Sequence, residues 1–489
     1  MIKRGSNTKQ LWLIWISLLL LLITSCKEPN SEITEPKNEG IKITILYTND
    51  EHGWMEPTET TGGAAGLMGL WKSKEGYTKD GPYLILSGGD MWTGPAISTW
   101  YKGKSMVEVM NAMHYDAAAI GNHEFDFKID ELRNREKQSN FPFLSANIRE
   151  KKTGNIPDFS TPFILKEING VVIGIIGLTT TSTPLTTFPA NVVDYNFIPY
   201  STALREVVPK AKEAGAELII VIGHICENEM RGLISLSNEL GISVIGGGHC
   251  HRIVSDVVKN VAIIESGSFM QNYAKVELWY DDQNNEVQNI TSSVIPNING
   301  IPDGEIESIV AKWQNKMNSS LSEVIGYTNT EIGRNSNEMY NMITDSWLIK
   351  FPNADVSLTN AGGIRQSIPV GNITLATIVG VLPFENTIVK LELTGKQLIN
   401  STNYLVIGGM TTIGGYKLSD GSEINADNTY NVLTTDYLYS RPDYSFQYDD
   451  TTPYQTSVHY RQPVIDWIKS LNTSVSNPIN NYLDSNPRK

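Results

Sequence analysis

The chain has 489 residues, which is too long for one compact core and predicts two or three domains. Its formal net charge of −14 argues against nucleic acid as a main partner, because phosphate backbones attract faces rich in Lys and Arg. A small phosphorylated substrate remains compatible with this charge, since metal ions can neutralise it locally.

The first forty residues have the pattern of an export signal. Three basic residues precede a short apolar run at 11–23, which suits a signal peptide better than a membrane-spanning helix. The following "ITSC" resembles a bacterial lipobox, so we expect a lipoprotein signal peptide at 1–25 and a lipid on Cys26. Residues 26–40 are polar and contain two prolines, which predicts a flexible tether. An ordinary cleaved signal with an incidental cysteine is the alternative.

These features predict a protein that is exported and held by lipid at a bacterial membrane, facing the periplasm or the cell surface. No later segment of the sequence is long and apolar enough to span a bilayer.

Five short apolar segments in the first 300 residues end in turns, and each turn carries polar side chains suited to metal binding. We expect these segments to be strands of a layered α/β fold, in which functional sites gather beyond the carboxyl ends of the strands. The expected strands are 41–48, 83–87, 116–120, 217–222 and 242–246.

The turns after these strands offer imidazole, carboxylate and amide groups, a mixture that suits Zn, Mn, Fe or Co. Seven ligands are too many for one tetrahedral ion, so we predict two divalent ions that share a carboxylate. An isolated Asp-x-His or histidine is usually a surface turn or a packed side chain, but the combination is specific. The candidates are Asp50, His52, Asp90, Asn122, His224, His249 and His251.

The spacing within this set predicts how two pairs of ligands converge. Asp50 and His52 are separated by one residue, as are His249 and His251, so in an extended backbone each pair would point the same way. The histidines outside the set and its immediate neighbours are His114, which we place at a helix end, and His459, which we place on the surface.

Several motifs together resemble the calcineurin-like metallophosphoesterases and, more specifically, the 5'-nucleotidase family. They are "NDEHG", "SGGD", "GNHEFD", "GGAAGL", "FPFLSAN" and "GHCH". The resemblance implies an α/β fold with an N-terminal four-layer α-β-β-α sandwich and a smaller C-terminal α/β domain that binds substrate. We expect the sandwich at 41–300, a linker helix at 301–326 and the C-terminal domain at 327–489.

The resemblance also assigns roles to the ligand set. Asp50, His52 and His251 would hold the first metal, Asp90 would bridge, and the second site would be completed by Asn122, His224 and His249. His123 and Asp126 match the family's catalytic dyad, in which the carboxylate orients and charges the imidazole. Metal-bound hydroxide would attack the phosphorus, and the imidazolium would stabilise the developing charge.

In the C-terminal region, "SLTNAGGIRQSI" and two later segments resemble the family's nucleotide-binding motifs. Two aromatic side chains would stack on the base. The sequence departs from the pattern at 441–444, where "RPDY" replaces a glycine-rich loop. This departure favours a third possibility, hydrolysis of non-nucleotide phosphate or sulfur esters, and the aromatic residues could instead be core. The residues implied are Asn360, Arg365, Phe384, Tyr437 and Asp443.

The resemblance therefore implies an exported, lipid-anchored 5'-nucleotidase that releases phosphate from nucleoside monophosphates in nucleotide catabolism. The alternatives on the same site are a 2',3'-cyclic-nucleotide phosphodiesterase and a UDP-sugar hydrolase. A non-catalytic surface binding lipoprotein is the alternative of another class, although neither a ligand nor a dyad residue is missing from the sequence.

Two cysteines lie beside the candidate ligands. Cys226 follows His224 by two residues, and Cys250 lies between His249 and His251. Three interpretations are open: two inert buried thiols, which the sequence favours, a disulfide behind the site, or a thiolate that supplements the metal ligands.

Overall fold

The computed structural model describes residues 40–489. The predicted signal peptide, Cys26 and almost all of the predicted tether lie outside these residues. Within residues 40–489, no helix combines the length and the apolar character that crossing a bilayer requires.

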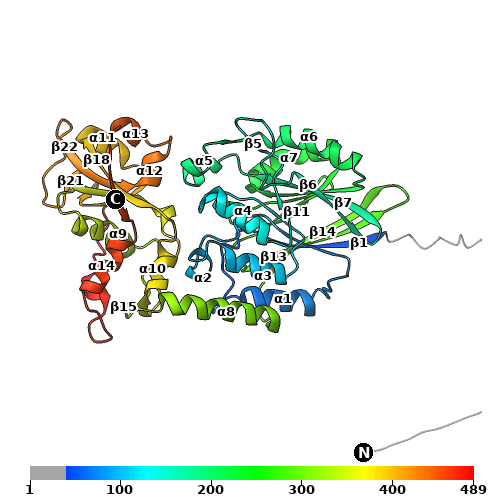
Figure 1. The fold of residues 1–489 in the computed structure, drawn as a ribbon, viewed down its shortest axis with the longest axis horizontal. Coiled ribbons are helices and arrows are strands. Elements are labelled where there is room, and N and C mark those ends of the chain that lie inside the picture. Colours follow the sequence, from blue (N-terminus) through cyan, green and yellow to red (C-terminus); the bar gives the residue numbers. More distant parts are fainter. Residues whose placement is uncertain (1–39) are drawn as a thin grey trace, which may run out of the picture. The chain divides into compact units, whose positions relative to one another are not determined.

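The N-terminal domain is built on two six-stranded sheets (Figure 1). In the first sheet, β1 to β4 are parallel and β13 and β14 add an antiparallel edge. Its order is β14 (Glu286–Pro296), β13 (Asn272–Asp281), β1 (Ile41–Thr48), β2 (Tyr83–Ser87), β3 (Ala117–Ala119) and β4 (Phe143–Leu144).

The second sheet has four parallel central strands and an antiparallel strand at each edge. Its order is β11 (Ile253–Val258), β12 (Val261–Ser266), β10 (Ile242–Gly246), β9 (Leu218–His224), β7 (Val171–Thr179) and β6 (Phe163–Ile168). All five strands expected from the sequence are present. Two have shifted bounds, because β3 is shorter than expected and β9 continues to His224.

Three hydrophobic clusters lie between four layers of secondary structure, which are two sheets and a layer of helices outside each sheet. The middle cluster consists of side chains from both sheets, such as Ile45 and Ile220, and joins the sheets face to face. The outer clusters bury helices against the remaining face of each sheet. One outer layer contains α1 (Gly63–Ser73), α3 (Lys104–Ala112), α4 (Lys128–Gln138) and α8 (Gly304–Leu321), and the other contains α6 (Tyr200–Glu213) and α7 (Glu227–Leu240). This arrangement confirms the α-β-β-α sandwich.

The smaller C-terminal domain surrounds a five-stranded sheet with a hydrophobic cluster on each face. The strand order is β19 (Leu405–Gly408), β16 (Val356–Asn360), β22 (Thr429–Thr435), β18 (Thr387–Thr394) and β23 (Tyr454–His459). One face packs against α9 (Asn337–Lys350), α10 (Leu375–Val381) and α14 (Gln462–Ser470). The other packs against α11 (Gly395–Ser401), α12 (Asp436–Ser440) and α13 (Phe446–Asp449).

Shorter elements complete the two domains. They are α2 (Ala96–Thr99), α5 (Thr183–Thr186), the pair β5 (Ile148–Glu150) and β8 (Tyr195–Phe197), the pair β15 (Val324–Thr328) and β17 (Gly371–Thr374), the pair β20 (Met410–Thr411) and β21 (Lys417–Leu418), and the 3-10 turns His123–Phe125, Pro189–Asn191, Ala361–Gly363 and Ile479–Tyr482.

Candidate metal centre and substrate cavity

The candidate ligands lie at the carboxyl ends of parallel strands in both sheets. Asp50 and His52 follow β1, Asp90 follows β2, and Asn122 lies between β3 and the 3-10 turn His123–Phe125. From the second sheet come His224, which is the last residue of β9, and His249 and His251, which follow β10. Since the two sheets stack with their carboxyl ends at the same edge, these turns meet.

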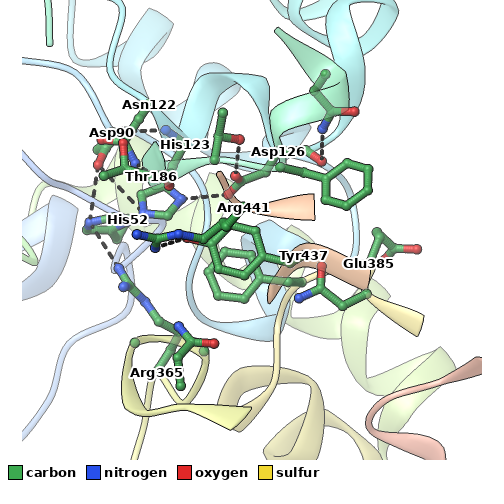
Figure 2. Close-up of a pocket in the computed structure, with 18 of the residues that line it drawn as sticks. His52, Asp90, Asn122, His123, Asp126, Thr186, Arg365, Glu385, Tyr437 and Arg441 are labelled. Atoms are coloured by element: carbon green, nitrogen blue, oxygen red, sulfur yellow. Dashed lines mark hydrogen bonds and ion pairs between the residues drawn. The ribbon is translucent and has the colours of Figure 1, made fainter. Parts of the chain in front are cut away.

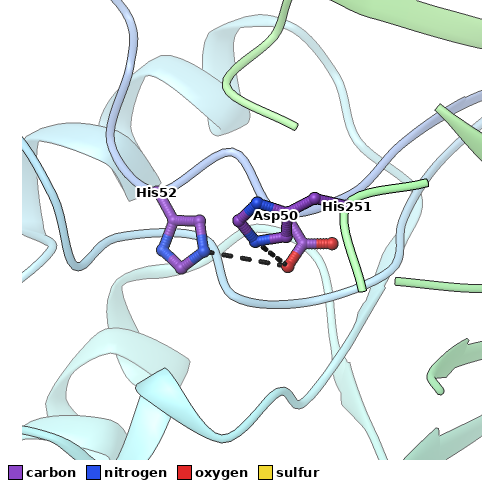
Figure 3. A group of neighbouring side chains, drawn as sticks. All are labelled: Asp50, His52 and His251. Atoms are coloured by element: carbon purple, nitrogen blue, oxygen red, sulfur yellow. Dashed lines mark ion pairs between the residues drawn. The ribbon is translucent and has the colours of Figure 1, made fainter. Parts of the chain in front are cut away.

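The side chains form two groups that could each hold an ion. Asp50, His52 and His251 make the first group, and Asp90, His224 and His249 make the second; the ligand atoms of each group lie within 4.8 Å of one another. In the first group, Asp50 Oδ1 lies 3.1 Å from His251 Nε2 and 3.7 Å from His52 Nε2 (Figure 3).

Asp90 lies between the two groups. Its Oδ2 atom is 2.9 Å from His224 Nε2 and 3.8 Å from His52 Nε2, so one carboxylate oxygen faces a histidine of each group. Its Oδ1 atom accepts a hydrogen bond from the backbone N–H of His123 at 2.8 Å. A side chain at Gly121 would place its Cβ atom 2.2 Å from this oxygen, which explains the glycine of "GNHEFD".

Hydrogen bonds aim the ligand atoms of two histidines at the centre. His52 Nδ1 is 2.9 Å from the carbonyl oxygen of Thr93, and His224 Nδ1 is 2.9 Å from that of Gly88. A carbonyl oxygen can only accept, so Nδ1 carries the proton and Nε2 keeps its lone pair for a metal. Burial, together with the Arg365 guanidinium, also holds the pKa of His52 well below its usual range.

Two buried oxygens of the candidate ligands have no hydrogen-bond donor among the described residues. They are Asp50 Oδ1 and Asn122 Oδ1. Asp50 Oδ2 accepts from the N–H of His249 at 2.9 Å, and Asn122 Nδ2 donates to the carbonyl of Thr186 at 3.0 Å, so in each side chain the other polar atom is fixed. An unsatisfied buried oxygen is costly unless a cation compensates it, so the donor set fits two divalent ions.

Five of the seven candidate ligands have left-handed backbones. The φ angles are 51° at Asp50, 45° at His52, 58° at Asp90, 73° at His249 and 54° at His251. The ligand pairs therefore converge through tight left-handed turns, and the extended geometry expected from their i, i+2 spacing is wrong. These conformations are uncommon for residues with a side chain and are found at functional sites.

His123 and Asp126 form a hydrogen-bonded pair at the edge of the metal groups (Figure 2). His123 Nδ1 is 2.7 Å from Asp126 Oδ2, and His123 Nε2 is 4.0 Å from Asp90 Oδ2. Burial alone would lower the pKa of His123, but Asp126 and Asp90 outweigh burial and raise this pKa above its usual value. The imidazole can therefore carry a positive charge beside the metal centre.

A cavity of about 450 Å³ extends from the metal groups into the C-terminal domain. Arg365 is at the metal end, with Nη2 3.3 Å from His52 Nε2. Phe384 stacks beside His123 with ring centroids 5.7 Å apart. Asn360 and Tyr437 also line the cavity, and the Tyr437 hydroxyl donates to the carbonyl of Leu185 at 3.1 Å.

Comparison with known proteins agrees with this architecture. The calcineurin-like phosphoesterase family model matches residues 43–252, and the model of the 5'-nucleotidase C-terminal domain matches residues 320–401. The chain belongs to the 5'-nucleotidase family of calcineurin-like phosphoesterases. This confirms the family resemblance seen in the sequence motifs.

The relatives include Protein UshA of Escherichia coli, which is 27% identical over 78% of this chain and 79% of that protein. Endonuclease YhcR of Bacillus subtilis is 26% identical over 82% of this chain, but the chain spans only 37% of that protein's length. A crystal structure of a 5'-nucleotidase precursor from Thermus thermophilus superposes with a TM-score of 0.78 at 22% identity, covering 92% of this chain and 99% of that one.

Of the five residues expected to bind substrate in this 5'-nucleotidase-family chain, Asp443 alone does not line the cavity. Its side chain is 43% exposed and forms an ion pair with Arg441. Arg441 lines the cavity instead, and its Nη1 atom donates to the Tyr437 hydroxyl at 2.8 Å. The segment "RPDY" replaces glycines here, but its sequence alone does not predict that the arginine would enter the cavity.

Glu124 was also missed, although it lies inside the "GNHEFD" motif. This glutamate is buried and accepts hydrogen bonds from the backbone N–H groups of Asp90, Met91 and Gly121 at 2.8, 2.8 and 2.6 Å. Burial, with a further contribution from Asp90, raises the pKa of Glu124 to about 8. Its side chain ties together the turns that carry Asp90 and Asn122.

Cys226 and Cys250 form a disulfide in this structure, with Cα atoms 5.2 Å apart. The interpretation as inert buried thiols, favoured by the sequence, is wrong: Cys250 is exposed, and the two sulfurs are bonded. Cys226 caps the N-terminus of α7, so the bond attaches the turn that carries His249 and His251 to a helix.

Proposed function

We propose that this protein is a bimetallic phosphohydrolase, and that its substrates are nucleoside 5'-monophosphates. One observation carries the proposal: a single cavity is lined by members of both metal-ligand groups, by the His123–Asp126 pair, and by an arginine and two aromatic rings from the other domain. A phosphate at the metal end would leave the nucleoside beside Phe384 and Tyr437.

The side chains of the cavity suit an in-line phosphoryl transfer. Two divalent ions, when bound, supply Lewis-acid stabilisation of the phosphoryl oxygens and an activated water. Arg365 presents a guanidinium that can hold and orient the phosphate. His123, kept cationic by Asp126, can stabilise charge on the phosphoryl group and donate a proton to the leaving oxygen.

The proposal also covers the remaining expectations. Phe384 and Tyr437 would hold the base by stacking, with Asn360 beside them. The domains would divide into the sandwich at 41–300, the linker helix at 301–326 and the C-terminal domain at 327–489.

Lipid on Cys26, after removal of 1–25, would anchor the exported protein to a bacterial membrane at the periplasm or cell surface. The lipobox-like "ITSC" supports the anchor.

Arg441 favours a second candidate function on the same site. Its guanidinium lines the cavity beside Tyr437, where it could meet a second phosphate. A nucleotide-sugar diphosphate, the substrate of a UDP-sugar hydrolase, carries such a group.

A substrate panel tests these proposals. Protein reconstituted separately with Zn, Mn, Fe and Co would be assayed on AMP, UMP, 2',3'-cyclic AMP, UDP-glucose and p-nitrophenyl phosphate. We expect the highest kcat/KM on the monophosphates. Higher kcat/KM on UDP-glucose would favour the second candidate, and equal values on AMP and p-nitrophenyl phosphate would contradict nucleotide specificity. A metal-loaded protein that bound nucleotides without turnover would be a non-catalytic binding lipoprotein.

A further inference from the structure

A polar segment in the N-terminal domain, residues 182–191, runs along the metal centre. We name it the 182–191 strap; it contains α5 and the 3-10 turn Pro189–Asn191. Ser182 Oγ lies 3.4 Å from His249 Nε2, and the carbonyl of Thr186 accepts the hydrogen bond from Asn122 described above. The strap therefore contacts two candidate metal ligands. Figure 2 shows Thr186 close to Asn122 and His123.

Thr187 of the strap contacts the carboxylate of the dyad. Its hydroxyl donates to Asp126 Oδ1 at 3.0 Å, while Asp126 Oδ2 lies 2.7 Å from His123 Nδ1. Thr187 is 2% exposed and the Asp126 side chain 6% exposed, so water has little access to replace this hydroxyl. The two oxygens of the carboxylate are thus held by two different segments of the chain.

Hydrogen bonds fix the strap on both sides of Thr187. Asn191 Nδ2 donates to the carbonyl of Phe125 at 2.9 Å, which fixes the strap against the turn that carries the dyad. On the other side, the carbonyl of Leu185 accepts from the hydroxyl of Tyr437 in the C-terminal domain at 3.1 Å. Thr187 lies between these two attachments, so its hydroxyl is presented to Asp126 from a fixed backbone.

We propose that Thr187 is a positioning residue of the His123–Asp126 dyad. With one oxygen bound to Thr187, the carboxylate cannot rotate about its Cβ–Cγ bond without losing a hydrogen bond. The other oxygen then stays in line with His123 Nδ1, and this fixes the direction of His123 Nε2 toward the cavity. The proposal rests on the proposed phosphohydrolase function, because Thr187 acts only through the dyad.

The test compares Thr187→Val, which has nearly the same shape but lacks the hydroxyl, with Thr187→Ser, which keeps it. We expect Thr187→Val to lower kcat on AMP and on p-nitrophenyl phosphate by about 10- to 100-fold, with little change in KM or bound metal. Thr187→Ser should restore most of the loss. Thr183→Val is the matched control, because the Thr183 hydroxyl donates to the carbonyl of Thr180 within the same region and does not touch the dyad; its kcat should stay near that of the wild type.

A double-mutant cycle separates positioning from a general effect on the fold. In an Asp126→Ala background, Thr187→Val should cause almost no further loss, because the group through which it acts is gone. Full additivity of the two losses, or a Thr187→Val protein with wild-type kcat, would overturn the inference. Wild-type protein inactive on every phosphate ester would instead refute the proposed function, so the two failures are distinguishable.

Discussion

The side chains of Asp90 and His123 are neighbours, with His123 Nε2 4.0 Å from Asp90 Oδ2, but their proposed roles differ and substitution can separate them. Asp90→Ala should lose bound metal and activity together, because it removes the carboxylate between the two ligand groups. His123→Ala should keep its metal and lower kcat by roughly 10²–10⁴-fold, the usual range for a positioned acid or charge-stabilising group. Metal analysis after dialysis, alongside steady-state kinetics, checks both. Metal-free His123→Ala with metal-loaded Asp90→Ala would reverse the assignment.

His459 gives a prediction for the dependence of stability on pH. The expectation of a surface position is wrong, since this side chain is half-buried and contacts the Arg461 guanidinium, with Nε2 2.8 Å from Nη2. Arg461 also donates to Glu385. Burial, followed by the charge of Arg461, lowers the pKa of His459 to about 3.

The folded state therefore keeps His459 neutral where the unfolded chain, with a pKa of about 6.5, binds a proton. The contribution of neutral His459 to the free energy of unfolding is fully present above pH 6.5 and is lost as the pH falls from 6.5 toward 3. At pH 5 the loss is at most about 2 kcal/mol. His459→Gln should show a smaller fall in melting temperature between pH 7 and pH 5 than the wild type. An equal fall in melting temperature for the two proteins between pH 7 and pH 5 would contradict this account.

The disulfide links the N-terminus of α7 to the turn after β10, and this gives a prediction about stability and metal binding. The Cys226→Ser, Cys250→Ser double variant should lose about 2–4 kcal/mol of stability, because the bond closes a loop with a sequence separation of 24 residues. It should also bind metal more weakly, since the turn carrying His249 and His251 loses its attachment to α7. Calorimetry and metal titration check these effects. Wild-type protein treated with a thiol reductant should behave like the variant; melting unaffected by reductant would argue against the bond.

Elements differed in how well their sequences predicted them. Strands such as β1 and β10 are runs of buried apolar residues that end in turn residues, so their positions followed from the pattern. The 182–191 strap has neither helical nor strand periodicity, and its contacts are with residues far along the chain, so no local signal identified Thr187. The left-handed turns at the ligands were also missed, because aspartate and histidine mark that conformation far less clearly than glycine.

The cavity lies between two domains, so one variant in the C-terminal domain should separate recognition from chemistry. Phe384→Ala should lower kcat/KM on AMP by about 10- to 100-fold, since base stacking on an aromatic ring is worth roughly 1–3 kcal/mol. It should leave p-nitrophenyl phosphate turnover nearly unchanged, and Phe384→Tyr should keep most AMP activity. Phe384 also contacts a hydrophobic cluster of its own domain, so equal losses on both substrates would identify it as a packing residue.

Across the whole chain, the metal end of the cavity was easier to predict than the substrate end. Each metal candidate lies at or just beyond the carboxyl end of a strand, and the strand order brings these strand ends together. The substrate end depends on which way a loop turns. Asp443 pairs with Arg441, and Arg441 donates to the Tyr437 hydroxyl, an arrangement that matching residues one by one does not reveal.

The left-handed backbones of the candidate ligands have a consequence for directed evolution. Asp50, His52, Asp90, His249 and His251 each hold a conformation that costs a residue with a side chain about 1–3 kcal/mol, and that glycine adopts freely. Selection for thermal stability alone, in a medium without divalent metals, should therefore enrich glycine at these positions. The selected proteins should be more stable but catalytically inactive. Sequencing the selected library would then identify the ligand positions as those where glycine has replaced the original residue.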